Sequence, residues 1–118
     1  MKIGELAKAT TISVETIRYY EKIGLLKNVQ RNASGHRVYT QKDFDWVRFI
    51  KRLKETGMPL ENILQYAALR EKGVTTTSQR QQLLEQHQQR LKIHIQQQQQ
   101  HLLALEEKIH LYKDGKVR

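Results

Sequence analysis

The chain contains no cysteine, and this absence excludes several kinds of site. Disulfides, thiolate zinc sites, thiolate sensing of mercury or copper(I) and thiol redox switches all require cysteine sulfur. Catalytic motifs are missing too, since the chain has no Gly-rich phosphate loop, no His-Glu-x-x-His pair and no Gly-x-Ser-x-Gly turn. We therefore expect a protein that is not an enzyme, has no catalytic residues and binds no metal or cofactor.

Long apolar runs are also absent. No run approaches the roughly 20 residues of a transmembrane helix, and the N-terminus lacks the apolar core of a signal peptide. We expect a cytoplasmic protein with no membrane partner. The hydrophobic content of 38% is low for a compact globule, which favours extended helix over much of the chain.

Positive charge is plentiful. Lysine and arginine number 21 against 12 acidic residues, which gives a formal net charge of +9. Such a surplus favours a polyanionic partner, and counterion release would make binding to nucleic acid strongly salt-dependent.

Residues 3–24 predict two short helices joined by a tight turn, the pattern of a helix-turn-helix. Ser13 is placed to cap the second helix and Gly24 to end it. On that helix Ile17 and Tyr20 would face inward. Three side chains remain for a DNA groove or the phosphate backbone: Thr16, Arg18 and Tyr19.

Residues 28–39 predict a β-hairpin, because a Ser-Gly turn signal separates short strand-like segments. Arg31, His36 and Arg37 cluster near its tip. A basic hairpin beside a helix-turn-helix is a winged arrangement, with the wing placed to enter or straddle a minor groove.

Two further helices are predicted over residues 40–73. Thr40 and Asp43 fit a capping box at the start of the first, which runs to Gly57. Pro59 suits the first turn of the second. Residues 75–78 then predict a linker that also offers an N-cap.

From about residue 79 to 112 there is no glycine or proline, and a heptad repeat predicts a coiled-coil helix. A lone helix has nothing to cover such a seam, so we expect a homodimer. The proposed dimerisation residues are Leu84, Leu91, Ile95, Leu102, Leu105 and Ile109, with Gln88 and Gln98 as polar seam positions and Tyr112 closing the repeat.

Three histidines, His87, His94 and His101, recur every seven residues beside this seam. A step of seven is about 10.5 Å along a helix, so one helix cannot bind a single ion through them. A metal bridge or pH response across two chains and an ordinary hydrated flank both stay open.

Several motifs together resemble the MerR family of bacterial transcription regulators, over essentially the whole chain. They lie at residues 3–7 (IGELA), 16–21 (TIRYYE), 24–26 (GLL) and 34–39 (SGHRVY). Residues 49–60 and 66–69 resemble the aldehyde-responsive, AdhR- or NmlR-like branch. That branch is expected to carry a cysteine where this chain has Arg52, so thiol sensing is not expected.

The resemblance implies a homodimer joined by an antiparallel coiled coil, which binds a pseudo-palindromic promoter. It further implies regulation by bending and untwisting the DNA between the −35 and −10 elements, with RNA polymerase as a partner. The effector is unknown. By the same resemblance, DNA contacts are expected from Thr16, Arg18 and Tyr19 of the recognition helix, Gly35, His36, Arg37 and Tyr39 of the wing, and Arg48 or Arg52 of the next helix.

The predicted fold class is mainly α. Residues 1–74 would form the winged helix-turn-helix domain with its helix pair, and residues 75–118 the coiled-coil dimerisation helix and tail. The predicted function is sequence-specific regulation of transcription at double-stranded DNA. Two alternatives remain: a nonspecific nucleic-acid-binding protein, for packaging or for RNA, and a coiled-coil interaction protein.

Overall fold

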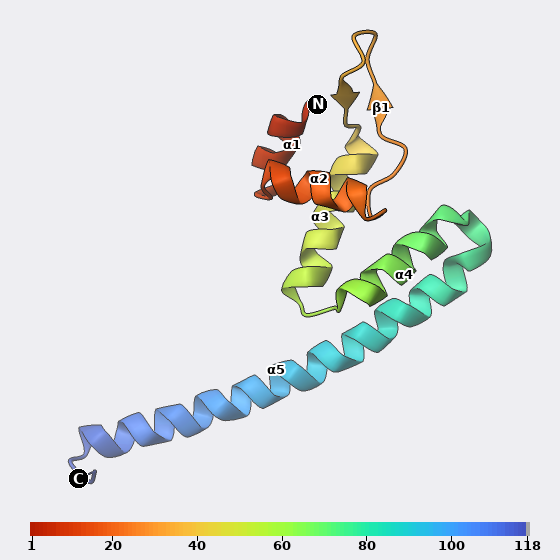
Figure 1. Cartoon of the computed structure of the whole chain (residues 1–118). Helices are drawn as coiled ribbons and strands as arrows, with labels where there is room; N and C mark the ends of the chain where they lie inside the picture. Colours follow the sequence, from red (N-terminus) through yellow and green to blue (C-terminus); the bar gives the residue numbers. More distant parts are fainter. Residues whose placement is uncertain (118) are drawn as a thin grey trace. The chain divides into compact units, whose positions relative to one another are not determined.

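The computed structural model describes residues 1–117 and is mainly helical (Figure 1). Its elements follow in the order α1 (Ile3–Thr10), α2 (Val14–Lys22), β1 (Gln30–Arg31), β2 (Arg37–Val38), α3 (Gln41–Glu55), α4 (Leu60–Glu71), η1 (Gly73–Thr76) and α5 (Thr77–Lys113). A helix-turn-helix, a wing, a helix pair and a long C-terminal helix are all present, so the predicted fold class is confirmed. The chain divides into two compact units, and the second begins at Leu84, inside α5.

The turn between α1 and α2 is fixed by short-range hydrogen bonds. Thr11 adopts a left-handed conformation with φ of 56°, and the N–H of Ile12 donates to the carbonyl of Ala7 at 3.1 Å. The hydroxyl oxygen of Ser13 then accepts the N–H of Thr16 at 3.1 Å. This bond satisfies one of the free donors of the first helical turn, which confirms Ser13 as the N-cap.

The end of α2 turns the chain back toward the core. Gly24 has φ of +87°, a conformation that costs a residue with a side chain about 1–2 kcal/mol. The N–H groups of Leu25 and Leu26 donate to the carbonyl of Tyr20 at 2.8 and 3.1 Å. Both leucines are buried as a result, and Tyr20 itself is only 3% exposed, as predicted.

The wing is a short antiparallel hairpin in which Gln30 pairs with Val38 and Arg31 with Arg37. The chain then enters α3 through the predicted capping box. The N–H of Asp43 donates to Thr40 Oγ1 at 3.2 Å, and the N–H of Thr40 donates to Asp43 Oδ2 at 2.9 Å. Because each strand has only two residues, the position of the wing depends on backbone contacts with Met1 at its base and on an ion pair with α2.

The core of the first unit draws one or two side chains from each helix. The most completely buried aliphatic residues, each no more than 1% exposed, are Leu6, Ile17, Leu26, Val47, Ile50 and Ile63. They come from α1, α2, the segment after α2, α3 and α4. This shared core fixes α2 against α1, α3 and α4.

Trp46 joins α3 to the segment that follows α2 and to α4. Its indole Nε1 donates to the carbonyl of Leu25 at 2.7 Å, and its ring stacks on Tyr66 with centroids 5.8 Å apart. The guanidinium of Arg70 lies 4.2 Å from the centre of the indole ring. The hydrogen bond is buried, so the carbonyl of Leu25 depends on it for a partner.

Trp46→Phe is expected to lower the free energy of unfolding by about 1–3 kcal/mol, because it leaves that buried carbonyl without its donor. Denaturant titration followed by circular dichroism at fixed protein concentration would measure the change. Tyr66→Phe is the matched control, since it deletes a polar group from the same aromatic cluster without removing a bond to Leu25. Equal losses in the two variants would contradict the assignment.

The predicted linker over residues 75–78 is wrong in part, because the chain stays helical there through η1 and the start of α5. Thr76 is buried, and its hydroxyl donates to the carbonyl of Leu69 at 2.6 Å. Arg80 reaches back from α5 and donates to the carbonyl of Gly73 and to Thr76 Oγ1, both at 3.2 Å. These bonds satisfy polar groups that would otherwise favour an open loop.

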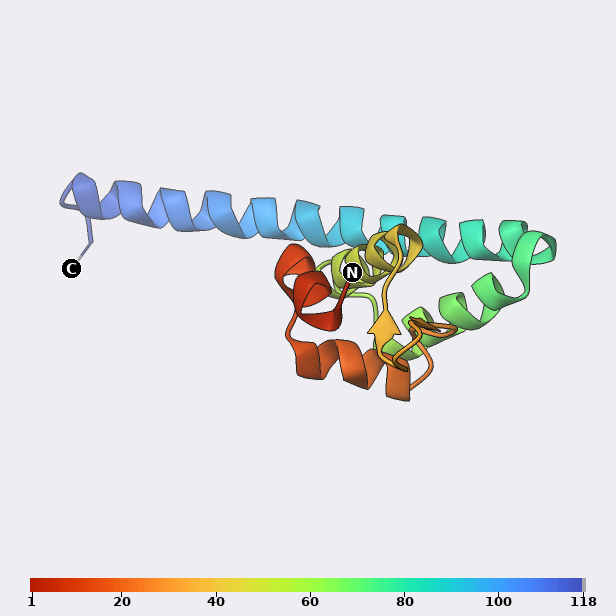
Figure 2. The ribbon, with the colours of Figure 1, turned by 90° about the horizontal axis from the view of Figure 1, so that it is seen from above.

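α5 is one continuous helix of 37 residues, about 55 Å long at 1.5 Å per residue (Figure 2). Gly115 follows it with φ of +67°, and the N–H of Lys116 donates to the carbonyl of Leu111 at 3.0 Å. This is a common way for a helix to end. None of the described helices is long and apolar enough to cross a membrane.

Candidate nucleic-acid interface

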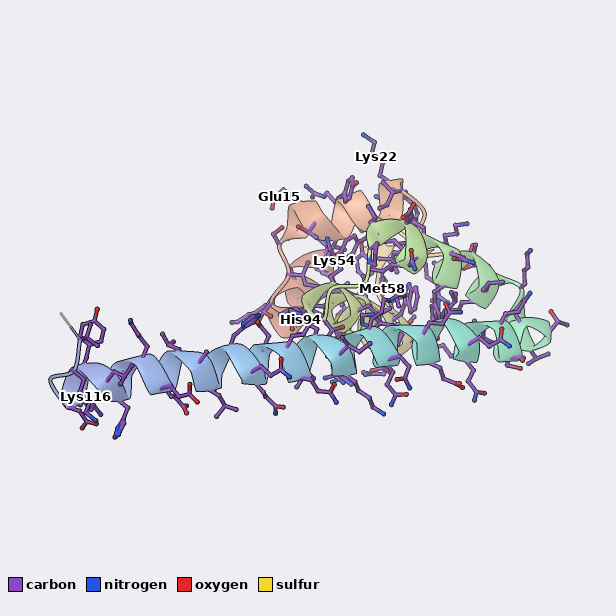
Figure 3. The ribbon with its side chains drawn as sticks, turned by 90° about the horizontal axis from the view of Figure 1, so that it is seen from below. Glu15, Lys22, Lys54, Met58, His94 and Lys116 are labelled. Atoms are coloured by element: carbon purple, nitrogen blue, oxygen red, sulfur yellow. The ribbon has the colours of Figure 1, made fainter. Side chains whose placement is uncertain are left out.

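An open hollow of about 720 Å³ lies between α2, the wing and the start of α1. It is lined by Lys2, Ile3, Arg18, Glu21, Lys22, Arg31, Gly35, His36, Arg37 and Tyr39. Five of these side chains are cations and one is a carboxylate, so the lining carries a net charge of +4 with histidine neutral. We call this surface the basic hollow. Figure 3 shows Lys22 projecting away from the end of α2.

Five of the residues predicted to contact DNA line the basic hollow: Arg18, Gly35, His36, Arg37 and Tyr39. Arg18 comes from the middle of α2 and the other four from the predicted wing, residues 28–39. Tyr19 is not part of the lining, but its side chain is 47% exposed on the same helix. Thr16 lies one turn earlier, where its hydroxyl shares a 2.8 Å hydrogen bond with Ser13.

The wing is tied to α2 by an ion pair. Arg37 Nη2 lies 2.7 Å from Glu21 Oε2, and Arg37 Nε donates to Glu21 Oε1 at 3.0 Å. The pairing is therefore bidentate, which fixes direction as well as distance. It joins two residues that are 16 apart in the sequence and so links the wing directly to α2.

Glu21→Gln is expected to lower the ratio of specific to nonspecific DNA affinity by about tenfold. A loosened wing must be ordered on binding at both half-sites, at about 0.5–1.5 kcal/mol for each immobilised side chain. The lost negative charge meanwhile strengthens binding to any sequence. The folded protein should change little, because Arg37 is 44% exposed and exposed pairs are worth about 1 kcal/mol or less.

Competition between an operator duplex and a scrambled duplex would measure that ratio. Glu71→Gln is the matched control, because it removes the same charge from an exposed position outside the basic hollow. An equal change of the ratio in both variants would show that net charge, not the anchor, is responsible.

The tip of the wing is organised by Asn32. Its side-chain oxygen accepts the N–H groups of Ser34 and His36, each at 3.0 Å. Gly35 sits between them with φ of +82°, and its carbonyl accepts a bond from Arg31 Nη1 at 2.8 Å. Gly35 is therefore needed for the conformation of the wing tip, because a residue with a side chain would be strained at this φ. Its predicted contact with DNA is a separate role.

Tyr39 was expected among the DNA contacts of the wing, but it lies in the floor of the basic hollow and not on its rim. The structure buries its side chain, which is only 2% exposed, because the backbone of Met1 pairs with Tyr39 at the base of β2. The N–H of Tyr39 donates to the carbonyl of Met1 at 2.7 Å, and the N-terminal ammonium donates to the carbonyl of Tyr39 at 2.6 Å. Burial, with the nearby carboxylate of Glu21, raises the pKa of Tyr39. Tyr39 thus supports the hollow from beneath.

Arg48 and Arg52 lie outside the basic hollow. They line a second, smaller hollow of about 220 Å³ on α3 and the end of α1. Arg48 Nη2 lies 3.9 Å from Asp45 Oδ1, and the guanidinium of Arg48 lies 5.2 Å from the centre of the Phe44 ring. In the same hollow, Lys51 donates to the carbonyl of Thr10 at 3.0 Å and also bonds the hydroxyl of Thr11.

Three cations of the basic hollow were not among the predicted site residues: Lys2, Lys22 and Arg31. Lys22 follows Arg18 by four residues on the same helix, so helical spacing could have found it. Arg31 was recognised as part of the basic wing tip. Lys2 reaches the hollow only because residue 1 pairs with Tyr39, and no local sequence signal indicates that.

The predicted dimerisation residues leave an apolar stripe on α5. Ile95, Leu102, Leu105 and Ile109 are between 46% and 58% exposed, and Leu84 and Leu91 are half-buried. Other large apolar side chains, Ile93 and Leu103 among them, are exposed away from this stripe.

The histidine row is not uniform in its surroundings. His87 is buried, and burial together with the charge of Arg90 lowers its pKa, whereas His94 and His101 are exposed. No group of three or more residues able to hold a metal ion is found within residues 1–117.

Comparison with known proteins identifies two family matches. The family described as "MerR HTH family regulatory protein" matches residues 1–70, and the one described as "MerR, DNA binding" matches residues 44–110. Among curated relatives, the transcriptional regulator AdhR of Bacillus subtilis (strain 168) is 36% identical over 91 residues. That alignment covers 77% of this chain and 65% of AdhR, so the chain spans less than two thirds of that relative.

Solved structures extend the similarity along the chain. A MerR family transcriptional regulator from Listeria monocytogenes has a TM-score of 0.90 at 34% identity, covering 96% of this chain and 86% of its own. HiNmlR, a MerR family regulator lacking the sensor domain, was solved bound to promoter DNA. It has a TM-score of 0.88 at 34% identity and covers 98% of this chain and 88% of its own.

Proposed function

Because the chain belongs to the MerR family of DNA-binding transcription regulators, we propose that it binds a pseudo-palindromic promoter as a homodimer. Each protomer contributes one winged helix-turn-helix to one half-site. The members of this family are regulators of transcription and not enzymes. The dimer changes transcription by distorting the DNA between the −35 and −10 elements, where RNA polymerase is its partner.

The observation that carries this proposal is the basic hollow. Its cations come from two elements, α2 and the wing, that must act together on any duplex lying against them. A helix of this size fits the major groove, and a short basic hairpin beside it reaches the neighbouring minor groove or its phosphates. A surface of net charge +4 in each protomer would also give strongly salt-dependent affinity.

The side chains of this surface differ in the part of the duplex that they would contact. Arg18 and Tyr19 extend from α2 toward base edges and the backbone, with Thr16 beside them. His36 and Arg37 act from the wing, and Lys2, Lys22 and Arg31 add phosphate contacts. Arg48 and Arg52 would hold flanking phosphates from α3, through their own smaller hollow.

Dimerisation through α5 supplies the second module. One winged unit reads only a few base pairs, so two must be held at a fixed spacing to define an operator. The exposed apolar stripe on α5 supports this role, since such a stripe on a long helix calls for a partner. Since the proposed target is promoter DNA, the protein would act in the cytoplasm.

The direct test is selection of genomic duplexes by the purified protein, followed by footprinting of the enriched fragments at two salt concentrations. Enrichment of one palindromic promoter, with a protected region of two half-sites, is the expected result. Salt-sensitive protection of every fragment would favour the nonspecific nucleic-acid-binding alternative. Absence of DNA binding by a folded dimer would favour a coiled-coil interaction protein.

A further inference from the structure

Two side chains of α3 hold the recognition helix α2 from outside it, one before its start and one after its end. Lys51 Nζ donates to the carbonyl of Thr10 at 3.0 Å and also donates to the hydroxyl oxygen of Thr11. Trp46 Nε1 donates to the carbonyl of Leu25 at 2.7 Å. Thr10 is the last residue of α1, and Leu25 lies just beyond the end of α2. α3 therefore fixes the backbone that leads into α2 as well as the backbone that leaves it.

The contact of Lys51 lies at the turn that sets the direction of α2. Thr11 adopts a left-handed conformation there, with φ of 56°, and Ser13 follows two residues later as the N-cap of α2. The last carbonyls of a helix have no partner within it, and a cation is favourable at this end of the helix dipole. The ammonium of Lys51 supplies both the donor and the charge. The turn is thus closed by a side chain that lies 40 residues further along the chain than Thr11.

Lys51 differs from Arg52, its neighbour in the smaller hollow. An ammonium has three N–H donors, and here two of them are used by Thr10 and Thr11. The carboxylate of Glu55 lies 3.7 Å from the same nitrogen, and the side chain of Lys51 is only 30% exposed. Arg52 is exposed and, among the described residues, forms no ion pair. Arg52 is therefore available to a phosphate, whereas the ammonium of Lys51 is already used within the protein.

We propose that Lys51 is a positioning residue for DNA recognition, which holds the turn before α2 in the geometry that operator binding requires. This role rests on the proposed function and adds a determinant of specificity that does not itself touch the DNA. Thr16 and Arg18 lie in the first two turns of α2, so a shift at the start of this helix moves both of them. A cation that binds phosphate would instead strengthen binding to every sequence.

Lys51→Met is expected to lower the ratio of specific to nonspecific DNA affinity by about tenfold. The substitution keeps a side chain of similar length but removes the ammonium, so the carbonyl of Thr10 loses its charged donor. The freed turn must then be ordered on binding, which should reduce specific affinity by about threefold at each of the two half-sites. Nonspecific affinity should change little, because it depends on contacts to phosphate that Lys51 does not make.

Competition between an operator duplex and a scrambled duplex, repeated over a range of salt concentrations, tests this role. Arg52→Met is the matched control, because it removes one positive charge by the same replacement at the next residue of the same hollow. In Lys51→Met the ratio should fall, while the salt dependence of affinity stays that of the wild type. In Arg52→Met the ratio should be kept, and the salt dependence should decrease by about one phosphate contact for each protomer.

A purely structural role of Lys51 predicts a different result. If Lys51→Met only destabilised the fold, both duplexes would lose binding equally and the ratio would not change. Thermal unfolding would report the folded fraction at the temperature of the assay. A double-mutant cycle with Thr11→Ala locates the effect, since that substitution removes the hydroxyl that Lys51 contacts. Together, the two substitutions should lower the ratio by less than the product of their separate effects.

The outcomes separate the role of Lys51 from the proposed function. A wild-type protein that prefers no duplex over another would overturn the proposed function itself. Where the wild type does prefer its operator, an unchanged ratio in Lys51→Met would overturn the positioning role. The same conclusion would follow if Lys51→Met lowered the salt dependence as Arg52→Met does, or if its effect and that of Thr11→Ala multiplied in full.

Discussion

Arg18→Ala is expected to abolish operator-specific binding while the protein remains folded and dimeric. The side chain lies in the middle of α2 and lines the basic hollow beside the wing, so it faces the surface that the duplex must occupy. It is exposed and, among residues 1–117, forms no ion pair, so its removal should leave the packing of the first unit unchanged. The expected loss is therefore one of recognition and not of stability.

The magnitude follows from symmetry. A single arginine contact to a base or phosphate is worth about 1–3 kcal/mol, and the substitution removes it from both half-sites. The summed loss of about 2–6 kcal/mol corresponds to a decrease in affinity of about 30-fold or more. Fluorescence anisotropy with an operator duplex would measure it, and thermal unfolding would confirm that the fold is intact.

Lys72→Ala provides the matched control for Arg18→Ala. It removes one positive charge from an exposed residue at the end of α4, outside the basic hollow. Its affinity for the operator should fall only slightly, through the small change in net charge. If both variants lost affinity equally, the binding would depend on overall charge and the recognition role of α2 would be wrong.

Much of the fold was predictable because its signals are local. The cap at Ser13, the capping box at Thr40 and the left-handed residue at Gly24 each act within four residues of sequence. Such signals operate through backbone groups that any helix end must satisfy. The helix-turn-helix, the α3 start and the long α5 could therefore be placed without knowledge of tertiary packing.

The candidate site was predictable only in part, because its geometry depends on contacts between distant segments. Arg37 is held by Glu21, and Tyr39 is buried by pairing with residue 1. Neither contact leaves a periodic or local trace in the sequence. Residue type and position identified Arg18 of α2 and Arg37 of the wing, but not Lys22. The burial of Tyr39 and the inclusion of Lys2 required the tertiary structure.

Replacing Leu91 and Leu102 together by aspartate is expected to yield monomers that bind the full operator by orders of magnitude more weakly. Each leucine contributes about 1.5 kcal/mol or more when buried, and four such side chains are lost per dimer. A monomer loses the high effective concentration that a tethered second module provides at the neighbouring half-site. Light scattering would report the mass, and footprinting would report protection of the two half-sites.

Ile93→Asp with Leu103→Asp is the matched control for this double variant. It makes the same kind of change at two apolar residues of α5 that are 54% and 59% exposed and lie off the stripe. Because these positions lie off the predicted dimerisation stripe, this variant should remain dimeric and retain the full footprint. Dissociation of the control, with survival of the Leu91 and Leu102 variant, would place the dimer seam on another face of α5. In that case the Leu91 and Leu102 variant should still bind the operator and the control variant should not. Only a correctly paired dimer presents two basic hollows at the spacing of the half-sites.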